Sequence, residues 1–113
     1  MISPELIIDS NNRRLSLYLV EGDETPDVAV KFDGLVLSDY DGGIVARVRL
    51  QGGGVLTGTV TPRGAAEEEW ADLSWDSDLP SGEHLLEFQL TESSKVWTLP
   101  SRYPVLLRVR GSV

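Results

Sequence analysis

Hydrophobic and polar residues alternate with a period of two along most of this chain. In the segment IVARVRL, the apolar residues Ile44 and Val48 share one phase, and Arg47 and Arg49 occupy the other. Because successive side chains of a strand point to opposite faces of the sheet, this alternation indicates half-buried β-strands. The segments that show it are 14–20, 28–32, 44–50, 55–60, 70–75, 84–91, 95–99 and 105–110.

Stretches rich in glycine and proline separate these segments. EGDETPD (21–27) and DYDGG (39–43) have the composition of turns, and QGGG (51–54) predicts a hairpin between two strong strands. Helical periodicity is confined to AAEEEWADL (65–73), which can hold one turn at most. About six to eight short strands at spacings of roughly 8–12 residues predict an all-β fold, either an antiparallel sandwich or a barrel.

The length of 113 residues fits a single domain. Hydrophobic residues make up 41% of the chain and charged residues 25%, which suffices for one ordinary core. We place the domain at 13–113. Residues 1–12, which contain the strand-like ELII followed by SNN, are expected to form an N-terminal arm that is flexible or docked on a partner.

Charge and composition exclude several classes of function. The net charge is −8, and the ten basic residues are scattered along the sequence, so we expect no nucleic-acid partner. Cysteine is absent, which excludes disulfides, thiolate metal sites and a cysteine nucleophile. No apolar run approaches the roughly 20 residues that span a bilayer, and the N-terminus lacks a signal-peptide pattern. We therefore expect no membrane partner and a protein that is made soluble in the cytoplasm.

The stretch WDSDLPSGEHLLEFQLT (75–91) concentrates four acidic residues and the single histidine of the chain. It departs from the calcium loop of an EF-hand, because Pro80 and Ser81 stand where that loop needs an oxygen ligand and a glycine. Two pairs of turn carboxylates stay open as an irregular calcium site: Asp76 with Asp78, and Asp39 with Asp41. The alternative is that these are solvated carboxylates that bond their own backbone, and we expect no cofactor.

His84 is the residue of this stretch that could act as a base. It falls in phase with Leu86 and Phe88, so the alternation places it on the inward face of a strand. We expect a core histidine with one backbone partner rather than a catalytic base. Residue counts leave a Ser-His-Asp arrangement open, but the chain has no G-x-S-x-G elbow and no phosphate loop. No catalytic residue is assigned, and no enzymatic activity is expected.

The aromatic residues are candidates for an interface. Trp75 is in phase with core positions, whereas Trp70 and Trp97 fall on the outward phases of their strands. An outward tryptophan near Tyr103 would serve either as a sugar-stacking platform or as a protein-interface anchor. The structural alternative is that both tryptophans cover one end of the fold.

The densest acidic run is formed by Glu67, Glu68 and Glu69. Consecutive residues in an irregular segment point in different directions, so this run does not present the paired carboxylates that cleave glycosides. We expect a solvated loop that could meet a basic surface on a partner, and the three glutamates are included in the candidate interface.

Four segments together resemble a known family: GDETP (22–26), RVRLQGGGV (47–55), the stretch from Trp75 to Thr91, and KVWTLP (95–100). They occur in the order found in the small immunoglobulin-like domain of tailed bacteriophages, as at the N-terminus of the siphophage baseplate upper protein. The similarity extends over 15–110, and its third segment is the most specific. The position of His84 is commonly a tyrosine in that family.

The resemblance implies an immunoglobulin-like antiparallel β-sandwich of about seven to eight strands, without enzymatic activity. It implies a virion protein that binds other virion proteins in multiple copies within a larger assembly. Family members often continue into a fibre or receptor-binding region, and this chain stops at Val113. The expectation is an accessory or attachment subunit of the baseplate or tail, or a decoration subunit of the capsid.

A carbohydrate-binding module is the alternative from a different class. It requires Trp70, Trp97 and Tyr103 on one exposed face beside acidic residues, with or without calcium. Glycan binding that is weakened by Trp97→Ala would favour this alternative.

Overall fold

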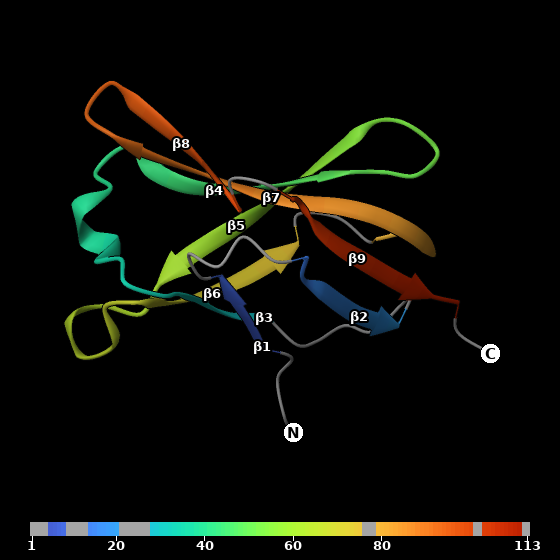
Figure 1. Ribbon diagram of the computed structural model, residues 1–113, viewed down its shortest axis with the longest axis horizontal. Coiled ribbons are helices and arrows are strands. Elements are labelled where there is room, and N and C mark those ends of the chain that lie inside the picture. The colour runs from blue at the N-terminus through green and yellow to red at the C-terminus, as the bar shows by residue number, and fades with distance from the viewer. Residues whose placement is uncertain (1–4, 9–13, 21–27, 76–78, 101–102, 112–113) are drawn as a thin grey trace.

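The alternating segments form the strands of one mixed sheet (Figure 1). A computed structural model of the chain describes residues 5–8, 14–20, 28–75, 79–100 and 103–111. The strands are β1 (Glu5–Ile8), β2 (Ser16–Val20), β3 (Val28–Phe32), β4 (Gly43–Arg49), β5 (Val55–Pro62), β6 (Trp70–Trp75), β7 (Gly82–Glu92), β8 (Lys95–Leu99) and β9 (Val105–Arg110). All eight predicted segments are strands, and β1 is added to them.

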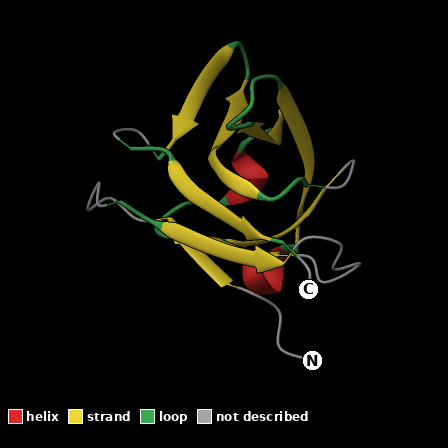
Figure 2. Ribbon diagram, turned by 90° about the vertical axis from the view of Figure 1, so that its right-hand side faces the viewer, coloured by secondary structure: helices red, strands yellow, loops and turns green. Residues whose placement is uncertain are grey.

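The sheet curls until it nearly closes into a barrel. Its strand order is β1-β3-β6-β5-β4-β7-β9-β2, and β8 pairs with β7 beside this path. The two end strands, β1 and β2, lie on the same side of the molecule (Figure 1), and Figure 2 shows the curl of the sheet from a second side. The buried apolar residues of the strands form one core cluster. The prediction of an all-β fold is therefore confirmed.

The expected antiparallel arrangement is correct only for the middle of the sheet. Six of its eight pairings are antiparallel, but β1 pairs parallel with β3 and β2 pairs parallel with β9. The pairing of β4 with β5 also joins all the strands into one continuous sheet. Parallel neighbours need a long connection, and alternation along one strand carries no information about a partner far away in the sequence.

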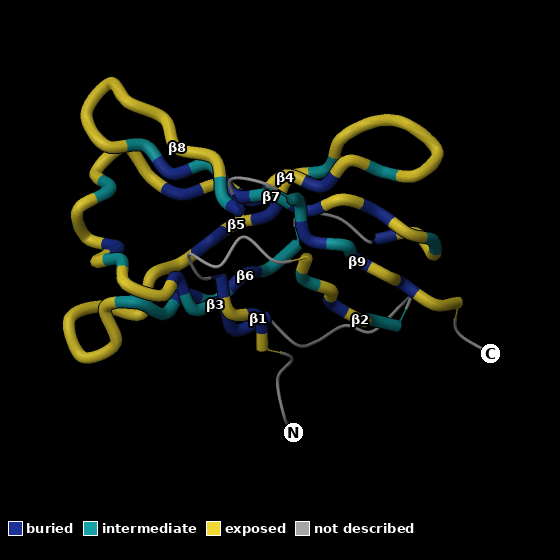
Figure 3. The backbone as a smooth tube through the Cα atoms, in the orientation of Figure 1, coloured by how far each residue is buried: buried dark blue, intermediate teal, exposed yellow. Residues whose placement is uncertain are grey.

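The inward phases predicted from the alternation are the buried ones, as the burial pattern in Figure 3 shows. Phe32 of β3 and Phe88 of β7 are fully buried, and their rings meet edge to face with centroids 5.2 Å apart. Three strands (β6, β5 and β4) separate β3 from β7 in the sheet order, so this contact crosses the interior of the barrel. The core thus joins opposite walls of the curled sheet.

Part of the expected N-terminal arm belongs to the sheet. Glu5–Ile8 forms β1, which pairs with β3 along its whole length. Leu6 and Ile8 are buried in the core, because their phase in β1 faces the interior. The rest of the segment 1–12 lies outside the described residues.

The turns follow the predicted chemistry in most places. In the β4–β5 hairpin, Gly53 and Gly54 both have positive φ angles (100° and 88°), which a glycine adopts without steric cost. Ala65–Glu67 forms a helical turn, η2, in the segment where the sequence predicts one turn at most. Leu37–Asp39 forms another turn, η1, that was not predicted. Both are 3-10 turns, and the described residues contain no helix with the length and apolar content needed to cross a membrane.

The long strand β7 is flanked by two strands on one edge. Residues 82–86 pair with β9, residues 88–92 pair with β8, and the opposite edge pairs with β4. The half of β7 that pairs with β8 therefore extends as a hairpin away from β9 (Figure 1). This hairpin carries the most exposed strand of the fold, as its colour in Figure 3 indicates.

Candidate interaction surfaces

His84 is a buried structural residue at the start of β7. The backbone N–H of Gln51 donates a hydrogen bond to its Nδ1 (3.0 Å), and its Nε2 donates to the carbonyl oxygen of Pro80 (2.8 Å). Both ring nitrogens are thus occupied by backbone groups, one more than the sequence predicts. A ring held in this way is not available as a catalytic base.

Gln51 completes a small network that we call the Gln51–His84 latch. Its side-chain Oε1 accepts a hydrogen bond from the backbone N–H of Glu83 (2.8 Å). A Cβ atom at Gly82 would lie 2.7 Å from that oxygen, and Gly82 has a φ of 136°. The latch fastens the end of β4 to the start of β7, and a glycine is required where the two segments meet.

The acidic run is largely engaged in contacts within the chain. The carboxylate of Glu69 accepts a hydrogen bond from the N–H of Gly34 (3.1 Å), and Glu67 forms an ion pair with Arg63 (3.5 Å). The backbone carbonyl of Glu68 accepts a bond from Leu37 (3.0 Å), while its side chain is exposed. The run therefore holds the two 3-10 turns together, and the side chains of Glu67 and Glu68 are both exposed to solvent.

The described residues contain no group of three or more histidine or acidic side chains arranged to hold a metal ion. Asp41 accepts a hydrogen bond from the backbone N–H of Ser93 (2.9 Å), so it ties the β7–β8 turn to the start of β4. Asp39 is exposed in η1. The other proposed pair, Asp76 and Asp78, lies outside the described residues.

Trp70 is half-buried at the start of β6 and belongs to an ion-pair network. The Arg63 guanidinium lies over its ring, 5.4 Å from the centroid, and forms a 2.7 Å hydrogen bond with Asp72. This hydrogen bond raises the pKa of Arg63 above its ordinary value. Trp70 therefore packs against its own chain on the outer face of the sheet.

The three candidate aromatic residues do not gather on one surface. Trp97 of β8 stands opposite the buried Leu90 and shares its side of the sheet, whereas Trp70 points to the outer side. Three strands (β5, β4 and β7) separate the strands of these two tryptophans. Tyr103 precedes β9 and is half-buried, with Arg14 over its ring at 4.8 Å. These three residues therefore do not form a common platform for a sugar.

Strand β8 is an exposed edge. Its residues from Lys95 to Thr98 are all exposed, including Val96 (59%) and Trp97 (51%). Among the described strands, β8 pairs with β7 alone, so its other edge presents unpaired backbone groups. Trp97 is thus the candidate aromatic residue that is free to contact a partner.

The structure also gathers basic residues that are scattered in the sequence. Arg47 and Arg49 lie on the outer side of β4, and Arg108 and Arg110 lie on the outer side of β9. We call the outer side of β4, β7 and β9 the arginine face. Each pair is spaced two residues apart within a strand, which places both of its arginines on one side. The sequence does not indicate that β4 and β9 lie on either side of β7, so it does not reveal the cluster.

Comparison of the chain with protein-family models, with curated proteins and with solved structures gave no match.

Proposed function

We propose that this protein is a non-enzymatic attachment subunit of a tailed-bacteriophage virion, located on the baseplate or tail or decorating the capsid. It binds other virion proteins, in multiple copies, through the exposed edge of β8. The observation that carries the proposal is this edge, which combines unpaired backbone groups with the exposed side chains of Val96 and Trp97.

The strand order supports the immunoglobulin-like character on which the proposal rests. Constant-type immunoglobulin domains have strands A, B, E and D in one sheet and C, F and G in the other. If β1 is strand A and β9 is strand G, the order β1-β3-β6-β5 followed by β4-β7-β9 is the same series. The departures are the parallel β1–β3 pair, the β4–β5 pairing that joins the two halves, and β2, which pairs parallel with β9 and has no place in that series. In this assignment β8 is an addition between strands F and G.

The β8 edge suits a partner that adds a strand. An extended segment that pairs with β8 would satisfy the unpaired backbone groups and continue the sheet. Val96 and Trp97 are neighbours in the strand and point to opposite sides, so such a segment would meet apolar surface on both of its faces. Tryptophan is also the residue type most enriched among those that dominate binding energy.

Particles purified from the phage that encodes the chain provide the test. We expect quantitative mass spectrometry to find the protein at a fixed copy number relative to the major capsid protein. The variant Trp97→Ser should reduce its incorporation about tenfold or more, as for a central interface residue. The matched control is Val36→Ser, which removes an exposed apolar side chain from the turn before η1.

Two results would contradict the proposal. One is the absence of the protein from purified particles, and the other is incorporation of Trp97→Ser at the unchanged copy number.

A glycan-binding function has one supporting observation, the exposed ring of Trp97. A glycan array distinguishes it from attachment. Binding of the purified protein to a defined glycan, with loss of binding in Trp97→Ala, would favour the glycan; incorporation into particles without any glycan binding supports attachment.

A further inference from the structure

The arginine face has a charge opposite to that of the whole molecule. The chain has a net charge of −8, yet this face carries four arginines (Arg47, Arg49, Arg108 and Arg110) against two glutamates (Glu83 and Glu87). Four of the exposed large apolar side chains lie on or beside the same surface: Tyr18, Val45, Val55 and Leu85. Exposed arginine next to aromatic and aliphatic groups is the composition of a protein-binding surface.

Three of these arginines, Arg47, Arg49 and Arg110, have no ion-pair partner among the described residues. Arg108 forms an ion pair with Glu83 (3.4 Å) and lies over the ring of Tyr18 at 5.8 Å. No carboxylate among the described residues lies within ion-pair distance of Arg47 or Arg49. The guanidinium groups on β4 therefore keep their hydrogen-bond donors for water or for a bound group.

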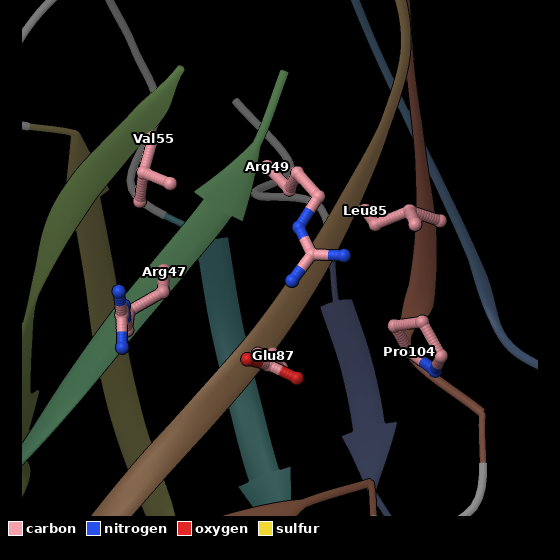
Figure 4. A pocket seen from close by; sticks show the side chains of 6 residues that line it. All are labelled: Arg47, Arg49, Val55, Leu85, Glu87 and Pro104. Carbon is pink, nitrogen blue, oxygen red and sulfur yellow. The ribbon is translucent and has the colours of Figure 1, made fainter. Parts of the chain in front are cut away.

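A depression of about 120 Å³ lies between these two arginines and β7 (Figure 4). Its lining consists of Arg47, Arg49, Val55, Leu85, Glu87 and Pro104. In Figure 4 the side chain of Arg49 extends from β4 toward β7, with Leu85 to one side and Glu87 below. Glu87 is opposite Arg47 in the register, so the two arginines exceed the single local carboxylate by one charge.

We propose that the arginine face is a second docking surface, and that it binds an acidic segment of another protein whose carboxylate side chain enters the depression between Arg47 and Arg49. The planar guanidinium group pairs with a carboxylate through two parallel hydrogen bonds. Val55, Leu85 and Pro104 line the same depression, and they would contact the apolar residues that flank the acid.

The same features disfavour a nucleic acid as the occupant. A phosphate backbone is bound by many cations in a row, and here an overall charge of −8 repels a polyanion. The exposed apolar side chains around the arginines match a protein segment better than a sugar–phosphate chain. This inference is independent of the β8 edge, which lies outside the arginine face.

The test is an NMR titration of the ¹⁵N-labelled protein with the capped peptide Leu-Glu-Ser-Glu-Leu-Glu. We expect shifts confined to the outer positions of β4, β7 and β9 and to the Nε–H signals of Arg47 and Arg49. Arg49→Gln should weaken binding about tenfold or more, the value expected for loss of a charge-assisted pair. Arg49→Lys keeps the charge but loses the paired donors, and it should also weaken binding by several fold.

The matched control is Lys95→Gln, which removes one exposed positive charge from β8 and should change the affinity less than about twofold. Because Arg49 and Lys95 are both exposed, each variant should retain the dispersed spectrum of the folded protein. The inference is wrong if the peptide with Gln in place of Glu binds equally well, or if the shifts lie elsewhere. It is also wrong if a ten-residue oligothymidylate binds more tightly than the peptide. Concentration-dependent shifts of this face without peptide would overturn it as well, in favour of a second copy of the chain.

Discussion

At the scale of single residues, the hydrogen-bond partners of a side chain show whether it has a structural role or is free to bind. His84 is the residue whose type most invites a catalytic interpretation, but backbone groups occupy both of its ring nitrogens. Arg49 has no such partner in the described chain, although nothing in its position in the sequence distinguishes it from other strand residues. A polar side chain that already has hydrogen-bond partners within the chain is structural, and one that lacks them is available for function, whatever its residue type.

The Gln51–His84 latch gives a prediction at this scale. His84→Leu introduces an apolar side chain of similar size and leaves the Gln51 N–H and the Pro80 carbonyl without partners. We expect the free energy of unfolding to fall by about 1–3 kcal/mol, the cost of leaving polar groups unsatisfied in a partly buried site. Urea denaturation followed by tryptophan fluorescence measures the change.

The control is Gln89→Leu, the same kind of polar-to-leucine replacement on the same strand but on its outer phase. It should change the stability by less than about 0.5 kcal/mol. If His84→Leu were as stable as the unchanged protein, the latch would have no role in holding β4 to β7.

At the scale of elements, the sequence predicts which segments are strands and which side of each strand is buried. The phase of Ile44 and Val48, for example, is set by local alternation, which needs no knowledge of the rest of the fold. The parallel partners of β1 and β2 could not be predicted, because Glu5–Ile8 meets Val28–Phe32 only after the chain has folded. The grouping of the arginines could not be predicted for the same reason, because β4 and β9 come to lie on either side of β7 only through pairing between distant segments.

The place of β1 in the sheet can be tested by two neighbouring isoleucines. Ile8 is 3% exposed and packs in the core, whereas Ile7 is 46% exposed on the opposite phase. We expect Ile8→Ala to lower the free energy of unfolding by about 2–4 kcal/mol, because it leaves a cavity in the core. Ile7→Ala should cost less than about 0.5 kcal/mol. Equal effects of the two substitutions, measured by chemical denaturation, would mean that β1 is not anchored in the sheet.

At the scale of the whole molecule, the nearly closed barrel depends on contacts that cross its interior. The edge-to-face pair of Phe32 and Phe88 links the walls formed by β3 and β7. A domain of this size is stable by only about 5–15 kcal/mol, so the loss of one such contact is a large fraction of the total. The two surfaces proposed for binding, the β8 edge and the arginine face, lie outside this packed interior and depend on its stability.

The aromatic pair gives a prediction at this scale. Phe88→Ala should lower the free energy of unfolding by about 3–5 kcal/mol, and Phe32→Leu should lower it by a smaller amount. In a double-mutant cycle of the two substitutions, we expect a coupling energy of about 0.5–1.5 kcal/mol, because the rings are in direct contact. Strictly additive effects in thermal or urea unfolding would show that the pair does not connect the two walls.

The parallel pairing of β2 with β9 has a mechanical consequence. Five register pairs, from Ser16 with Leu106 to Val20 with Arg110, hold the two strands side by side and pointing the same way. A pulling force applied to the chain before β2 and after β9 acts along both strands in opposite directions. It therefore loads all the hydrogen bonds of the pair in shear at once, instead of opening them one after another. Such an arrangement resists tension far better than a hairpin pulled from its open end.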